Sequence, residues 1–290
     1  MSSSSRRIWI AALLAVLPCA AEVAPERIIS ASPNVTEILY GVGAFRSVIA
    51  VSDYCTYPPE VKTLPRIGKW QDNNLEQIVS LRPDLLIMSD VQAPLFGSQL
   101  HALGIRTLEV PSRTLEDTFR AIELIGRITR HEAQARELEA HVRSRLDAVR
   151  HRTSRLPRRR VLLVVDRTPG TLRDLYIATP NSFLADLIDA AGGVCVATPV
   201  PSGYSKINKE AVFALAPDLI IDFVHGSTSR LGEDPYAVWQ DLSELKPVRE
   251  RKVYPLRSEF LPHASQFVAD TAELFAGVIH PEAANRKPTR

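Results

Sequence analysis

The chain has 290 residues, of which 45% are hydrophobic and 23% are charged, and its formal net charge is +2. This length suits two lobes with packed cores, and three cysteines without a C-x-x-C pair exclude a disulfide-stapled module or a cysteine-built zinc site. The near-balance of 35 Lys and Arg against 33 Asp and Glu excludes a strong global field that would attract nucleic acid.

Residues 1–21 have the order of a secretory signal peptide. A polar start with two arginines precedes the apolar run Ile8–Leu17, and a short segment of small residues ends at Ala21. We expect cleavage after Ala21 by an ordinary Sec signal, with a twin-arginine signal as the alternative, and a mature protein in the periplasm. Lipid anchoring at Cys19 is a further alternative, which Pro18 disfavours.

The rest of the chain alternates short apolar strands with helical stretches. In the first half we predict strands at 27–30, 48–51, 85–88 and 107–110, with helices at 34–42 and 92–103. In the second half we predict strands at 161–165, 219–221 and 252–256, with helices at 182–191 and 266–278. This alternation predicts an α/β fold with two doubly wound lobes, in which helices cover both faces of parallel sheets.

A helical segment at 114–157 separates the two halves. It bounds an N-terminal lobe at 22–113 and a C-terminal lobe at 158–279, and residues 280–290 form a tail. Because a helix is a stiff joint, we expect small hinge motion between the lobes. The arginine-rich end of the segment is interpreted as a solvated helix face.

One sequence unit occurs twice in the chain. Residues 76–87 (EQIVSLRPDLLI) and 210–221 (EAVFALAPDLII) share Glu, Leu, Pro, Asp, Leu and Ile in register. In each unit a glutamate opens a short helix, which a proline then prevents from continuing. The repeat therefore places Glu76 and Glu210 at equivalent positions of the two lobes; ordinary helix N-terminal charges are the alternative interpretation.

The loops that follow the predicted strands contain the candidate ligand-binding residues. Doubly wound lobes bind ligands at the carboxyl ends of their strands, so two facing lobes form one cleft. Aromatic walls with a few polar groups suit a large, flat ligand, although each aromatic taken singly is also explained by ordinary packing. The candidates are Tyr54, Trp70, Tyr176, Tyr204, Glu259, Phe260 and His263.

Four segments resemble the Fe3+-siderophore/vitamin B12 family of periplasmic binding proteins, and within it the vitamin B12-binding members. They are SPNVTEIL (32–39), SDYCTYPP (52–59), WQDNNLEQIVSLRPDLLI (70–87) and LGI (103–105). The resemblance implies two α/β lobes joined by one long helix, with the ligand held between them. It also implies a non-enzymatic, monomeric binding protein of an ABC importer, which carries cobalamin or a related corrinoid and needs no resident cofactor.

The resemblance also implies residue roles. Tyr54 and Trp70 match positions that contact the corrin ligand, while Tyr176, Tyr204 and Glu259 match ligand-facing positions less closely. Glu76 and Glu210 match two carboxylates that pair with arginines of a permease dimer, and one acid per lobe suits a two-fold symmetric partner.

Departures from the family pattern keep other ligands open. His263 stands where corrinoid binders often carry Arg, and imidazole and guanidinium are different donors. Haem, with an axial ligand from Tyr54, Tyr204 or His263, or a ferric siderophore is the alternative cargo. Cys55 and Cys195 do not match the disulfide partners of the family, and we expect two separate thiols.

Two other classes of protein fit the residues less well. A hydrolase could use Glu259 and His263 as an acid–base pair, but we identify no nucleophile beside them. A binding protein for a bare metal ion is disfavoured because the seven histidines are dispersed.

Overall fold

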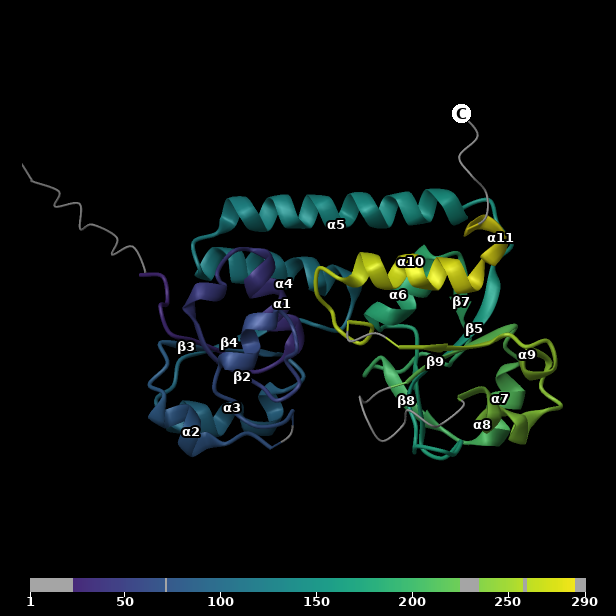
Figure 1. Cartoon of the computed structure of the whole chain (residues 1–290), viewed down its shortest axis with the longest axis horizontal. Coiled ribbons are helices and arrows are strands. Elements are labelled where there is room, and N and C mark those ends of the chain that lie inside the picture. The colour runs from purple at the N-terminus through teal and green to yellow at the C-terminus, as the bar shows by residue number, and fades with distance from the viewer. Residues whose placement is uncertain (1–22, 71, 225–234, 258–259, 285–290) are drawn as a thin grey trace, which may run out of the picture.

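The computed structural model describes residues 23–70, 72–224, 235–257 and 260–284, and within these ranges the chain forms two α/β lobes (Figure 1). The first lobe has a parallel four-stranded sheet in the order β2-β1-β3-β4. Its strands are β1 (Ile28–Ser30), β2 (Val48–Val51), β3 (Leu85–Ser89) and β4 (Thr107–Val110). Helices α1 (Pro33–Gly41), α2 (Leu75–Ser80) and α3 (Ala93–Ala102) connect them. The strands and helices predicted for this half are confirmed.

The second lobe has a mixed sheet instead of the parallel sheet predicted from the alternation. Its order is β10-β9-β5-β6-β8, with β7 beside the start of β5. The pairs of β5 with β6 and of β6 with β8 are antiparallel. Residues 167–174 between β5 and β6 are too few for a helical crossover, so the chain turns back as a hairpin. The strands are β5 (Arg159–Asp166), β6 (Leu175–Ala178), β7 (Gly193–Cys195), β8 (Tyr204–Ile207), β9 (Leu219–Phe223) and β10 (Val253–Leu256).

The helices of the second lobe lie on both sides of its sheet. They are α6 (Phe183–Ala190), α7 (Lys209–Leu215), α8 (Pro235–Trp239), α9 (Lys246–Arg249), α10 (Val268–Ile279) and α11 (Pro281–Ala284). Short 3-10 helices lie at Phe45–Ser47, Pro59–Thr63 and Gln240–Leu242. The ribbon places α6 and α10 on the side of α5 (Glu132–Thr153) and places α7 and α8 on the opposite side (Figure 1).

The segment between the sheets is a pair of helices rather than one helix. α4 (Leu115–Ile128) begins with a capping box, in which Thr114 and Asp117 each accept the main-chain N–H of the other. It ends before Arg130, whose φ of 62° cannot continue a helix. Gly126 lets α5 approach α4, because a Cβ there would lie 2.3 Å from the Cβ of Ala135. α5 then runs back along both lobes (Figure 1).

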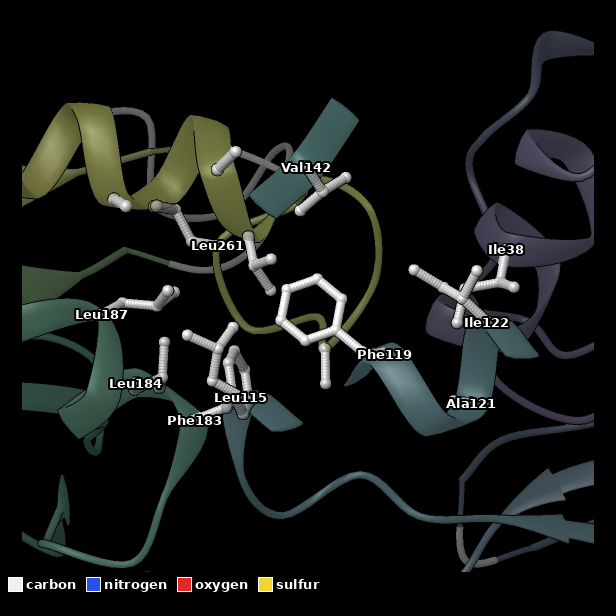
Figure 2. Close-up of a cluster of buried hydrophobic side chains, with 14 of the residues drawn as sticks. Ile38, Leu115, Phe119, Ala121, Ile122, Val142, Phe183, Leu184, Leu187 and Leu261 are labelled. Carbon is white, nitrogen blue, oxygen red and sulfur yellow. The ribbon is translucent and has the colours of Figure 1, made fainter. Parts of the chain in front are cut away.

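The interior has a shared part and two separate parts. One apolar cluster includes residues of both sheets and of α1, α4, α5, α6 and α10. Figure 2 shows Ile38 and Ile122 at one end of it, Phe119 in the middle, and Leu184 and Leu187 at the other end. A different cluster packs on the far face of each sheet, including Ile78 in the first lobe and Trp239 in the second. The lobes therefore share a core along the helical side while each keeps a core of its own.

Two hydrogen bonds also attach the start of α4 to the second lobe. The main-chain N–H of Phe183 donates to the carbonyl of Arg113 at 2.6 Å. The N–H of Leu115 donates to Oδ2 of Asp186 at 2.8 Å. The chain thus contacts the second lobe at residues 113–115, returns to the first lobe in α4 and leaves it again in α5. The segment between the sheets is therefore attached to both lobes.

Candidate functional site

The loops that carry Tyr54 and Trp70 are joined at the carboxyl end of β2. The N–H of Asp53 donates to the carbonyl of Gly68 at 2.8 Å. A tight turn follows, in which the N–H of Lys69 donates to the carbonyl of Asp72 at 2.9 Å. Glycine is required at position 68, because φ is +102° and a Cβ would lie 2.3 Å from the carbonyl oxygen of Asp72. Trp70 is therefore held in a turn beside the Tyr54 loop.

The Tyr54 loop has a rigid base that the sequence did not reveal. The Arg66 guanidinium donates to the carbonyls of Ser52 and Cys55 at 2.9 and 2.8 Å. The buried Cys55 thiol lies 3.1 Å from Oγ1 of Thr36, and burial raises its pKa. Tyr54 itself is 52% exposed, so it extends from an ordered base into solvent.

The second lobe brings Tyr176 and Tyr204 together. Their rings stack with centroids 5.6 Å apart and an interplanar angle of 20°. We predicted Tyr204 in a loop, but it begins β8, where it pairs with Ala178 of β6. Tyr176 lies two residues before Ala178 on β6, so both rings stand on one face of the β6–β8 strand pair. Burial raises the pKa of both phenols.

The loop before α10 contacts the first lobe. Nδ1 of His263 lies 2.7 Å from Oε1 of Glu37, and the Ser265 hydroxyl donates to Oε2 of the same carboxylate. The Gln266 amide donates to the Glu37 carbonyl at 2.7 Å. His263 is therefore an interlobe contact as well as a candidate ligand residue. Glu259 lies outside the described residues.

Phe260 belongs to an aromatic cluster that crosses between the lobes. Its ring stacks on Phe267 with centroids 4.0 Å apart and meets the edge of Tyr57 at 5.6 Å. Tyr57 in turn contacts Tyr40 at 5.2 Å, and Tyr40 contacts Phe45 at 5.8 Å. Desolvation raises the pKa of Tyr57. The sequence marked Phe260 as a candidate but gave no signal for its stacking partner Phe267.

Glu76 and Glu210 occupy equivalent places in the structure. Each is exposed in the first turn of a short helix, after an asparagine whose side chain caps that helix. Among the described residues, neither carboxylate has a hydrogen-bond or ion-pair partner that would fix it in place. α2 and α7 both lie on the side of the molecule away from α5 (Figure 1). The helices that carry the two acids therefore lie on the same side of the protein.

The packing around the two short helices is also duplicated. Arg27 donates to the carbonyls of Leu81 and Arg82 at the end of α2, at 2.6 and 3.1 Å. Arg160 donates to the carbonyls of Leu215 and Ala216 at the end of α7, at 2.7 and 3.1 Å. Asp84 and Asp218 accept the N–H groups of the same two arginines, at 2.9 and 3.0 Å. The sequence repeat is thus a structural unit that makes the same contacts in each lobe.

Two hollows lie on the second lobe, one beside α7 and the other beside α8 and α9. The larger, of about 780 Å³, lies beside α7 and is lined by Arg173, Asp174, Lys206, Lys209 and Glu210, among others.

The described residues contain no group of three or more His, Cys, Asp or Glu arranged to hold a metal ion. Within the same residues, no helix has the length and apolarity needed to cross a membrane. Cys55 and Cys195 are both free thiols.

Comparison with known proteins gives a consistent set of relatives. A family profile for periplasmic binding proteins matches residues 28–260. The vitamin B12-binding protein of Pectobacterium carotovorum is 28% identical, over 77% of this chain and 79% of its own. The protein of the same name from Pectobacterium atrosepticum is 26% identical, over 92% of this chain and 95% of its own.

Solved structures share the fold. The periplasmic vitamin B12 binding protein of Vibrio cholerae superposes with a TM-score of 0.76 at 24% identity, covering 90% of this chain and 99% of its own. A periplasmic haem-binding protein from Pseudomonas aeruginosa gives a TM-score of 0.75 at 23% identity, covering 92% and 95%. Both the predicted fold class and the resemblance seen in the sequence are therefore confirmed.

Proposed function

The chain belongs to the periplasmic binding protein family, and from this membership we propose that it is the binding protein of an ABC importer that carries cobalamin or a related corrinoid. The observation that carries the delivery role is the duplicated unit on α2 and α7, which presents one free acid per lobe on one side of the molecule. The names of the relatives favour the corrinoid.

Delivery then uses Glu76 and Glu210. A permease dimer with two-fold symmetry presents the same surface twice, and a protein with one equivalent acid per lobe can contact both copies. Cationic side chains on the permease, arginine above all, would form charge-assisted hydrogen bonds with these carboxylates.

Ligand binding then uses the candidate aromatic and polar residues of both lobes. Tyr54 and Trp70 offer aromatic surface from the first lobe, and the stacked pair of Tyr176 and Tyr204 offers it from the second. Glu259, Phe260 and His263 supply the remaining wall. A corrinoid is broad and largely apolar with polar edges, so its burial against aromatic rings is favourable.

Haem is the second candidate, and the Glu37–His263 contact favours it. Metal-ligating histidines usually hold their second ring nitrogen against a carboxylate or carbonyl, which fixes the orientation of the ring. His263 has this arrangement at Nδ1, and its side chain is 16% exposed. Nε2 would then be the atom that coordinates the iron of a haem. An anionic ferric siderophore would bind best beside several cationic side chains. It is a weaker candidate, because the candidate ligand residues are mainly aromatic.

The place of action follows from the same family. We propose that residues 1–21 direct export and that the mature monomer works in the periplasm, without catalysing a reaction. The signal segment and Cys19 lie outside the described residues. The hydrolase alternative, with Glu259 and His263 as its acid–base pair, stays a prediction, because Glu259 lies outside the described residues.

The test is isothermal titration of the mature protein with cyanocobalamin, cobinamide, haemin and a ferric siderophore. We expect one corrinoid molecule to bind per protein, without turnover. Haemin binding with a new absorption band that His263→Ala removes would assign the second candidate instead. Binding of none of the four would contradict the proposed ligand class.

A further inference from the structure

The exposed faces of α2 and α7 carry a second pair of equivalent residues besides the glutamates. Val79 in α2 is 43% exposed, and Phe213 in α7 is 42% exposed. Each lies three residues after its glutamate, at Glu76 and Glu210. Residues three apart share one face of a helix, so each acid has an apolar neighbour on the surface.

Both helices lie on their lobes with the same rotation. Ile78 and Val212, one residue before the exposed apolar positions, are fully buried. The caps are equivalent too, because the Asn74 side chain accepts the N–H of Gln77 and the Asn208 side chain accepts the N–H of Ala211, at 3.0 and 2.9 Å. The face turned to solvent is therefore the same face in each lobe.

A single exposed apolar residue needs no explanation, since all soluble proteins have some. Here exposure recurs at equivalent positions of a duplicated unit, each time beside a carboxylate that has no partner among the described residues. We infer that Glu76 with Val79, and Glu210 with Phe213, form two matched acid–apolar pairs that together bind a two-fold symmetric partner. This inference rests on the proposed importer function. It extends that function, because the surface that contacts the permease would include apolar side chains as well as the two acids.

The pairs define the chemistry of the partner. Each subunit of the permease dimer must present a cationic side chain next to an apolar hollow. Because the dimer offers the same hollow twice, the hollow has to be large enough for the Phe213 ring. Val79 then fills its copy only in part. The two lobes therefore contribute unequally to binding, and the permease hollow that receives Val79 keeps unfilled space.

The test measures binding of the mature protein to the purified permease dimer of its importer, reconstituted in lipid nanodiscs. Phe213→Ser should weaken binding by roughly tenfold or more, because a buried phenyl group is lost. Val79→Phe should tighten binding by filling the second hollow. Leu274→Ser is the matched control, because Leu274 is 45% exposed on α10, which lies beside α5 and away from α2 and α7 (Figure 1).

The outcomes separate this inference from the function on which it rests. Cyanocobalamin titration of every variant verifies that the protein is folded. One outcome is that Glu76→Arg with Glu210→Arg abolishes nanodisc binding while Phe213→Ser and Val79→Phe bind as the wild type does. Val79 and Phe213 then have no part in docking, and the docking role of the two glutamates stands. If the double charge reversal itself leaves binding unchanged, the docking role is wrong.

Discussion

Glu37 of α1 and His263 of the loop before α10 connect the two lobes through a contact of 2.7 Å between Oε1 and Nδ1. The Glu37 side chain is only 2% exposed, and its second oxygen accepts from Ser265. A carboxylate can be withdrawn from water in this way only where donors replace its hydration. The donors come from the other lobe, so the polar contact exists only while the lobes are held together.

Glu37→Ala should therefore destabilise the protein. Two donors, on His263 and Ser265, lose their acceptor, at a cost of about 1–3 kcal/mol for each donor that stays buried. Urea unfolding of the variant should show a lower midpoint with an unchanged slope. Glu139→Ala on the surface of α5 is a suitable control, because Glu139 pairs with Arg143 at partial exposure. Equal midpoints for Glu37→Ala and the wild type would show that the Glu37–His263 contact does not stabilise the fold.

Local patterns predicted most of the architecture. Runs such as 85–88 are apolar enough to specify buried strands. The antiparallel pair of β6 and β8 was missed because neither strand has a strong apolar pattern. Tyr176 and Tyr204 were predicted as candidates, but their stacking depends on strand register, which the sequence does not display.

The interlobe contacts could not be predicted from the sequence. Glu37 and His263 are 226 positions apart, and a lone glutamate inside SPNVTEIL looks like a surface residue of a helix. Only the packing of α1 against the second lobe gives it partners. Arg66 was missed for the same reason, because its role is to hold the carbonyls of Ser52 and Cys55 beneath Tyr54.

Trp70→Ala should weaken corrinoid binding by about 1–3 kcal/mol, because the ligand loses an aromatic surface in the cleft. Isothermal titration with cyanocobalamin measures the change directly. Leu103→Ala provides the control, since Leu103 is 50% exposed beyond the end of α3 and belongs to no candidate site. An unchanged affinity for Trp70→Ala would exclude Trp70 from the ligand site and leave the Lys69–Asp72 turn with a structural role alone.

Reversing the charge of both proposed docking acids should separate ligand binding from transport. Glu76→Arg with Glu210→Arg leaves the ligand residues untouched, so cyanocobalamin affinity should equal that of the wild type. Uptake by proteoliposomes that contain the importer should fall to background, because each lobe would now meet the permease with a like charge. Glu137→Arg changes an exposed acid on α5, on the opposite side of the molecule, and should transport normally (Figure 1). Normal uptake by the double variant would refute the docking role.

Asp218 should contribute to the acid sensitivity of the second lobe. The N–H of Arg160 and the ammonium of Lys246 hydrogen bond to its carboxylate and lower its pKa. Below about pH 4 the unfolded chain takes up a proton at this position that the folded chain does not, so stability falls with pH. The contribution is present above the unfolded pKa and is lost as pH falls through the folded pKa. Asp218→Asn should therefore flatten the acid limb of a urea-unfolding series between pH 3 and pH 7, and Lys246→Met should flatten it in part. Identical pH profiles for Asp218→Asn and the wild type would show that other carboxylates determine the acid limb.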